Sequence, residues 1–275
     1  MVTLVESSGH LMKQLLFPLL AALALNVAPV LAANSCTLQS PAHRIALLEL
    51  YTSEGCDSCP PADQFVSGLR AAGVAPQQAV ILSEHVDYWN DIGWKDPFSR
   101  AAFTERQRWL SDLVGSRTIY TPEMFIAGKE LRGGTNGGWV NGVPAAVKRV
   151  NDTPAQADIS IALGALGSAG LPVEVKASSA RDGKLYVALV ESGLASQVTA
   201  GENKGRLLHH DFVVREWLAP VTLAADGKSG QKAGGVTRML TLPPGAVSGK
   251  LGISAFVQTS KGEVLQALAL PVCGG

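Results

Sequence analysis

Two cysteines separated by two residues are the part of this sequence best suited to chemistry. Cys56 and Cys59 follow an apolar segment, residues 44–52, that predicts a buried strand. Because Pro60 and Pro61 are tolerated only in the first turn of a helix, a helix should begin at or near Cys56. The positive end of its dipole would stabilise a thiolate, the species that attacks disulfides. We therefore expect Cys56 to be an exposed attacking thiol and Cys59 to be the resolving thiol.

The elements predicted over residues 40–151 are a strand, a helix, a strand, a helix, two strands and a helix. With the cysteine pair after its first strand, this order is typical of a thioredoxin-like α/β domain, here with a helical and aromatic insert. Thr121 and Pro122 precede the predicted hairpin and are candidate substrate-binding residues, because a cis-proline at this point of the fold offers backbone to a substrate. Only about 5–6% of X-Pro bonds are cis, so a cis Thr121–Pro122 bond is a specific expectation. The alternative is a trans proline that opens a strand.

The N-terminal segment, residues 1–33, has the features of a signal peptide. Lys13 precedes an apolar run over residues 15–25, and small residues follow at the expected cleavage site, after Ala32 or Ala33. The apolar run is short for a membrane span. Residues 1–11 could lie upstream of the true start. We therefore expect a periplasmic or secreted protein that has no membrane segment after cleavage.

The other two cysteines lie near the two ends of the expected mature chain. Disulfides persist in oxidising compartments, and chain termini often lie close together at the surface. We predict that Cys36 and Cys273 form a structural disulfide. The alternative is two free or separately modified thiols.

Residues 155–275 form a second region of different composition, beyond a linker at residues 152–154. Its strand-like runs are punctuated by turn residues and predict an all-β, sandwich-like antiparallel domain. The runs are residues 159–163, 173–177, 185–191, 207–215, 236–242, 251–258 and 264–270. This region carries no chemical motif. His209 and His210 are neighbours on a strand and point to opposite faces, so we expect no chelating pair from them.

The part of the chain from Glu49 to Lys129 resembles the secreted family catalogued as domain of unknown function 1223, which has a thioredoxin-like fold. The resemblance implies fold and export and assigns no substrate. The motifs that carry it are residues 49–63 with the C-x-x-C, residues 85–89, residues 93–98, Arg106-Gln107 and Tyr120-Thr121-Pro122.

Further candidate site residues follow from this fold. In thioredoxins a buried acid behind the cysteines helps to move the proton of the resolving cysteine, and Glu49 could do the same here. Its alternative is a salt bridge at a strand edge. His85 could be a proton shuttle. Tyr88 and Trp89 could line a substrate groove, or they could fill space beneath a loop.

Three functions remain open on the residues alone. The first is thiol–disulfide exchange with a protein or small-thiol partner; the negative charges of Glu54 and Asp57 favour a reducing couple because they oppose a thiolate on Cys56. The second is Cu(I) handling by both thiolates of the motif and His85. The third is a non-catalytic binding module with a permanent disulfide.

Composition excludes some other classes. The chain has 23 Lys and Arg and 23 Asp and Glu, so its formal net charge of zero does not favour nucleic-acid binding. A phosphate-binding loop, a dinucleotide fingerprint and an H-E-x-x-H motif are all missing. We therefore expect no cofactor and no resident metal, and the oligomeric state stays open.

Overall fold

The computed structural model describes residues 36–133, 138–225 and 230–273. The signal peptide expected at residues 1–33 lies outside the described residues. Those described lie within one compact unit of the chain. Among the described helices, none combines the length and the apolar character that a membrane crossing requires.

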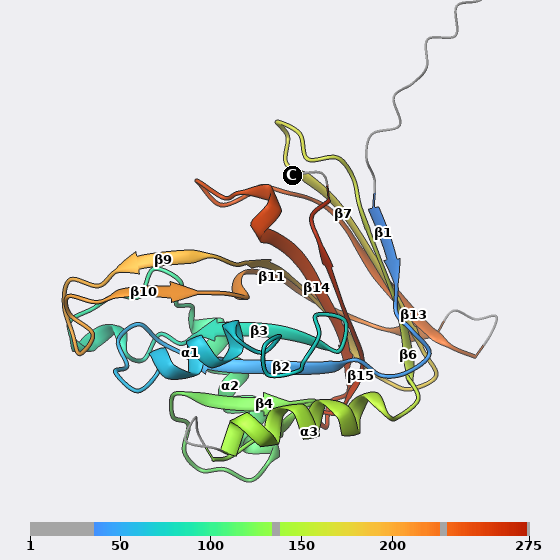
Figure 1. The fold of residues 1–275 in the computed structure, drawn as a ribbon. Helices are drawn as coiled ribbons and strands as arrows, with labels where there is room; N and C mark the ends of the chain where they lie inside the picture. Colours follow the sequence, from blue (N-terminus) through green and yellow to red (C-terminus); the bar gives the residue numbers. More distant parts are fainter. Residues whose placement is uncertain (1–35, 134–137, 226–229, 274–275) are drawn as a thin grey trace, which may run out of the picture. The chain divides into compact units, whose positions relative to one another are not determined.

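An eight-stranded mixed sheet carries the cysteine pair. Its strand order is β15-β14-β8-β11-β3-β2-β4-β5 (Figure 1). β2 pairs in parallel with β3 and in antiparallel with β4. The bounds of the four strands from the first half of the chain are β2 Ala46–Thr52, β3 Ala79–His85, β4 Glu123–Ile126 and β5 Lys129–Glu130.

Helices cover both faces of this part of the sheet. Side chains on β2 alternate between the faces, and apolar ones lie on both, so each face needs a covering helix. Leu48 and Leu50 pack with Val66 of α1 and Val143 of α3 in one apolar cluster. Leu47 packs with Phe103 of α2, in a cluster on the opposite face. The helices are α1 Pro60–Ser67, the short 3₁₀ helix η1 Asn90–Ile92, α2 Ala101–Leu113 and α3 Trp139–Asn151.

Strands from the second half of the chain extend the same sheet. β11 pairs with β3 in parallel at Val213 and Ser83, and thereby covers an edge whose backbone groups would otherwise lack partners. The antiparallel strands expected beyond residue 155 therefore do not all form a sheet of their own. The strands are β8 Lys184–Glu191, β11 Val213–Thr222, β14 Leu251–Gln258 and β15 Val264–Pro271. The boundaries expected at residues 151 and 155 stay predictions.

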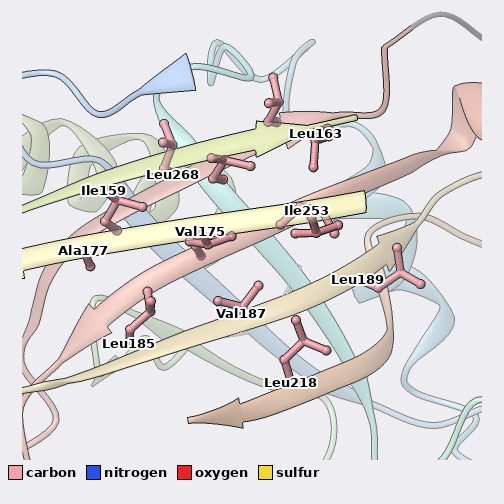
Figure 2. Packing of buried hydrophobic residues seen from close by; sticks show 14 of the residues in the cluster. Ile159, Leu163, Val175, Ala177, Leu185, Val187, Leu189, Leu218, Ile253 and Leu268 are labelled. Carbon is pink, nitrogen blue, oxygen red and sulfur yellow. The ribbon is translucent and has the colours of Figure 1, made fainter. Parts of the chain in front are cut away.

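A second, antiparallel sheet has the order β1-β6-β7-β13-β12. Ile159 and Val175 of this sheet share one apolar cluster with Val187 and Ile253 of the mixed sheet, so the two sheets face each other there (Figure 2). The architecture is thus mixed α/β. The strands are β1 Cys36–Gln39, β6 Ala157–Leu163, β7 Leu171–Ser179, β12 Ala224–Ala225 and β13 Lys232–Leu240, with a 3₁₀ turn η3 at Ser248–Lys250.

A two-stranded hairpin leaves the mixed sheet and packs on α1. It consists of β9 Leu194–Gln197 and β10 Leu207–His210, which pair in antiparallel. The sequence predicts one strand over residues 207–215, but the chain turns between β10 and β11, where Phe212 has a positive φ of 58°. This turn lets β10 diverge from β11 and reach the N-terminus of α1.

The two ends of the described chain are joined covalently. Cys36 of β1 and Cys273, which follows β15, form a disulfide with their Cα atoms 6.2 Å apart. This is the Cys36–Cys273 pairing that the sequence predicts. It ties the first strand of the antiparallel sheet to the end of the mixed sheet.

Candidate functional site

Cys56 and Cys59 form a disulfide immediately before α1, with their Cα atoms 5.4 Å apart. The helix begins later than the sequence predicts, because Cys59 is its N-cap and Pro60 and Pro61 fill its first positions. Two successive turns lead into it: the N–H of Cys56 donates to the Ser53 carbonyl, and the N–H of Cys59 donates to the Cys56 carbonyl. The motif therefore lies on the turns that precede the helix.

The expected exposure of Cys56 is wrong for this structure. Both cysteines are 0% exposed. The turn that carries Cys56 is packed against Trp89, since a Cβ placed on Gly55 would lie only 3.0 Å from the Trp89 Cβ. Attack on the Cys56 sulfur by an external thiolate thus requires the surrounding residues to move.

The Thr121–Pro122 segment lies against the cysteine pair. Its peptide bond is cis, as the sequence predicts. The Thr121 carbonyl oxygen is 3.8 Å from Cys56 Sγ, and the Trp89 indole Nε1 donates a 2.8 Å hydrogen bond to Thr121 Oγ1. Three of the predicted residues, Trp89, Thr121 and Pro122, are therefore gathered beside Cys56. Whether they bind substrate stays a prediction.

Tyr88 lies close to Thr121 and packs on the same buried cluster as Trp89. This cluster includes Phe125 and Leu110, and burial raises the pKa of Tyr88 to about 12. These contacts fit the space-filling alternative for Tyr88, and its substrate-binding role remains a prediction.

A glutamine that the sequence analysis did not assign to the site holds the Thr121 segment. Gln107 Nε2 of α2 donates to the Tyr120 carbonyl at 2.8 Å and to Glu123 Oε2 at 2.6 Å, so it bridges both flanks of the Thr121–Pro122 bond. Burial raises the pKa of Glu123 to about 7.

His85 is fully buried and paired with an acid. Its Nδ1 lies 2.7 Å from Asp96 Oδ2, and the backbone N–H of Glu54 donates to the same carboxylate at 2.8 Å. Burial lowers the pKa of His85, but the carboxylates of Asp96, Asp63 and Glu54 together outweigh burial and the net pKa is raised. Burial likewise raises the pKa of Asp96, yet His85 and backbone N–H groups hold it below its usual value.

A second buried imidazole comes from the hairpin. His210 Nε2 lies 3.0 Å from Glu54 Oε1, and its Nδ1 lies 3.9 Å from Asp63 Oδ2. The His85 and His210 rings meet edge to face, with their centroids 4.9 Å apart. Burial raises the pKa of Asp63 to about 6. We call the five residues the histidine–carboxylate cluster: Glu54, Asp63, His85, Asp96 and His210.

The loop at the tip of the hairpin also holds the cysteine motif. Asn203 Nδ2 donates to the carbonyl oxygens of Glu54 and Cys56, at 2.9 and 2.8 Å. The Asp57 N–H donates to Glu202 Oε2 at 3.1 Å. The sequence analysis missed these residues, and also His210, because no local motif links positions about 150 residues apart. The only available signal was the strand alternation that buries His210 and exposes His209.

Glu49 does not join the cysteines. It is buried on the β2 face that α2 covers, opposite to Leu48 and Leu50, and it forms a 2.5 Å ion pair with Arg106 Nε. Tyr51 donates a 3.3 Å hydrogen bond to the same carboxylate oxygen. The salt-bridge alternative describes these contacts, although β2 is an interior strand rather than an edge. The proton-transfer role expected of Glu49 gains no support.

The copper arrangement expected as an alternative is not formed either. Cu(I) would be held by thiolates, whereas the two sulfurs of the motif are bonded to each other and His85 Nδ1 is paired with Asp96. Across the described ranges, no set of three or more His, Cys, Asp or Glu side chains is arranged to hold a metal ion.

The chain is similar to proteins known by family and by structure. The family model described as a protein of unknown function (DUF1223) matches residues 47–258. Protein AGR_C_4864 from Agrobacterium tumefaciens is 24% identical, with a TM-score of 0.55 over 86% of this chain and 98% of that one. HBP35 of Porphyromonas gingivalis is 14% identical, with a TM-score of 0.62 over 85% of this chain and 76% of that one. These two likenesses concern the fold alone, and no curated protein matches the chain.

Proposed function

The chain belongs to the DUF1223 family of proteins of unknown function, and on that premise we propose that it is an exported thiol–disulfide exchange protein. Its reacting groups would be Cys56 and Cys59, and its partner a protein disulfide, a protein thiol or a small thiol. The observation that carries the proposal is the C-x-x-C disulfide at the start of α1 with the Thr121 carbonyl 3.8 Å from Cys56 Sγ. An export signal at residues 1–33 would place the protein in the periplasm or outside the cell.

The order of elements supports a thioredoxin-like fold for the first half of the chain. β2, α1, β3, α2, β4, β5 and α3 follow one another as a thioredoxin-like domain requires, with the cysteine pair between β2 and α1. In this proposal η1 and the loop that carries Trp89 and Asp96 are the insert.

The exchange would take place in two thiol-transfer steps. A substrate thiolate attacks Cys56 Sγ, the Cys56–Cys59 bond breaks, and its electron pair stays on Cys59 Sγ as a thiolate that takes up a proton. A second substrate thiolate then attacks the substrate sulfur of the mixed disulfide. Cys56 leaves as a thiolate, and the substrate leaves as a disulfide. When the protein reduces its partner the same steps run in reverse: the Cys56 thiolate attacks a substrate disulfide, and the Cys59 thiolate then attacks Cys56 Sγ and releases the second substrate thiolate.

The charges near the motif favour a reducing couple. Glu54 and Asp63 are buried acids within the turn and the helix that carry the cysteines. A carboxylate close to a sulfur disfavours the thiolate, which removes a source of stability from the reduced form. We therefore infer that the reduced protein passes electrons on to its partner.

The reduction potential of the Cys56–Cys59 pair tests this proposal. Purified mature protein would be equilibrated with glutathione or dithiothreitol mixtures, and each cysteine followed by alkylation and mass spectrometry, so that the Cys36–Cys273 bond is counted separately. A potential between about −120 and −270 mV supports exchange, and one near −270 mV supports the reducing direction. A value well below about −300 mV marks a structural disulfide.

A permanent disulfide on a binding module is the second candidate, and the complete burial of both cysteines favours it. The two candidates differ in the reactivity of the folded protein. An exchange protein loses the Cys56–Cys59 bond to dithiothreitol well before it unfolds. In a binding module the bond opens only at denaturant concentrations that unfold the chain.

A further inference from the structure

The histidine–carboxylate cluster takes Glu54 from the turn before Cys56 and Asp63 from the first turn of α1, so it adjoins the cysteine motif, and the thiol-transfer steps do not use it. We propose that Asp63 exchanges the proton of Cys59, and that His210 of the β9–β10 hairpin acts as a positioning residue that sets how readily Asp63 releases it. The second half of the chain would then be a working part of the redox site. This inference rests on the proposed function and adds its proton pathway.

Asp63 lies in the first turn of α1, the helix that Cys59 caps. It follows Cys59 by four residues, and its backbone N–H donates to the Cys59 carbonyl at 3.1 Å. Side chains four residues apart on a helix lie on one face, about 5–6 Å apart at their Cβ atoms. Asp63 is only 5% exposed, so bulk water has little access to its carboxyl group. Its pKa of about 6 lets it both donate and accept protons near neutral pH.

His210 is held in one orientation by its other neighbour. Glu54 Oε1 accepts from Nε2 at 3.0 Å, and the Trp94 indole donates to the second Glu54 oxygen at 2.8 Å. This hydrogen bond places one proton on Nε2, and protonation of Nδ1, which faces Asp63, gives the imidazolium whose charge acts on that carboxyl group. Among the described residues, His210 Nδ1 is buried without a hydrogen-bond partner. At 3.9 Å the contact with Asp63 is electrostatic, and the charge of His210 lowers the pKa of the Asp63 carboxyl.

The remaining groups around Asp63 come from three other elements. His85 of β3 also lowers its pKa, as does the nearby Thr52 side chain of β2, whereas Asp96 raises it. His85 and Asp96 are ion-paired at 2.7 Å, so their opposite effects on Asp63 partly cancel. His210 is the cationic group that the hairpin alone contributes.

The proton follows the electron pair in each direction. When a substrate thiolate opens the disulfide, the electron pair passes to Cys59 Sγ, and the protonated Asp63 carboxyl gives its proton to this thiolate. A Cys59 thiol and an Asp63 carboxylate result. When the disulfide closes, the Asp63 carboxylate takes the proton back from the Cys59 thiol. The new thiolate then attacks Cys56 in the mixed disulfide and releases the substrate thiolate.

The pH profile of disulfide opening tests this assignment. Mature full-length protein is mixed with dithiothreitol between pH 5 and 8, samples are quenched by alkylation, and each rate is divided by the dithiothreitol thiolate concentration. For the wild type, the rate per thiolate should be constant at low pH and fall up to tenfold per pH unit above an inflection near pH 6. In His210→Gln the inflection should move up by about one pH unit, so that opening at pH 7 becomes about fivefold faster.

Two further variants separate a proton-transfer role from a structural one. His209→Gln changes the exposed neighbour on the same strand and should leave the inflection in place. Asp63→Asn should remove the inflection, and this prediction stands even if His210→Gln does not fold. A folded His210→Gln protein with the wild-type inflection, or an Asp63→Asn protein that keeps it, overturns the inference alone. A folded wild type that dithiothreitol does not open overturns the proposed function as well.

Discussion

The His85 imidazole and the Asp96 carboxylate form an ion pair with 2.7 Å between Nδ1 and Oδ2, and neither side chain has any exposed surface. The pair joins the end of β3 to the insert that follows it. Because Asp96 also accepts the backbone N–H of Glu54, the pair fixes the turn just before the cysteine motif. Loss of the His85–Asp96 ion pair should therefore affect both the stability of the fold and the position of the cysteine motif.

Asp96→Asn should lower the free energy of unfolding by about 3 kcal/mol, because it leaves a buried imidazole without its counter-charge. The pH dependence should also change sign. In the wild type the pKa of His85 is raised, so its contribution is complete below the unfolded pKa of about 6.5 and is lost as the pH rises through the folded pKa.

In Asp96→Asn burial, the largest influence on His85, lowers its pKa against only the weaker charges of Asp63 and Glu54, so stability should instead fall as the pH drops below about 6.5. Urea unfolding of both proteins between pH 5 and 8 measures this. Measuring both proteins in an Asp63→Asn background isolates the pair, because the Asp96 charge also acts on the pKa of Asp63. Parallel curves would mean that His85 does not depend on Asp96.

Glu49→Gln should destabilise the protein without altering its redox chemistry. The substitution removes one carboxylate from Arg106, which keeps Glu84 at 3.8 Å as a weaker partner, so we expect a loss of about 2–3 kcal/mol in urea unfolding. The pH inflection of disulfide opening should stay where it is. A shifted inflection would restore to Glu49 the proton-transfer role that its position on the α2 face argues against.

Asn203→Ala should loosen the hairpin from the cysteine motif. It leaves the buried carbonyl oxygens of Glu54 and Cys56 without their donor, at a cost of about 1–3 kcal/mol. Because this cost destabilises the conformation in which Cys56 is buried, dithiothreitol should open the Cys56–Cys59 bond faster, by up to about tenfold. Lys204→Ala, at an exposed position of the same loop, is the matched control and should change the rate much less. Equal rates in the wild type and both variants would show that the hairpin does not restrain Cys56.

Replacing Cys36 and Cys273 together by serine should lower stability by about 2–5 kcal/mol, because this disulfide closes a loop with a sequence separation of 237 residues. The potential and opening rate of the Cys56–Cys59 pair should be unchanged, since the two disulfides share no contact among the described hydrogen bonds. Urea unfolding and the alkylation assay measure the two effects separately. A changed potential would mean that the terminal disulfide controls the site.

The sequence by itself determined the features that depend on neighbouring residues. The apolar run over residues 44–52, the prolines after Cys59 and the Thr121-Pro122 pair are local patterns, and they located β2, the start of α1 to within a few residues, and the cis bond. Six of the seven strand-like runs beyond residue 155 each fall on one strand, whereas the run over residues 207–215 is divided between β10 and β11. Such features can be predicted from sequence because backbone geometry and the alternation of faces depend on residues two to four positions apart.

The tertiary structure alone decided which distant residues meet. Glu49 and Asp63 are both acids near the motif in sequence, yet the alternation of β2 turns Glu49 toward Arg106, and α1 carries Asp63 toward His210. His210 reaches Asp63 because β11 pairs with β3 and the chain then turns at Phe212 to direct β10 onto α1. The physical reason is that strand pairing is set by the burial of whole sheet edges and faces. That choice belongs to the folded chain, and no short segment encodes it.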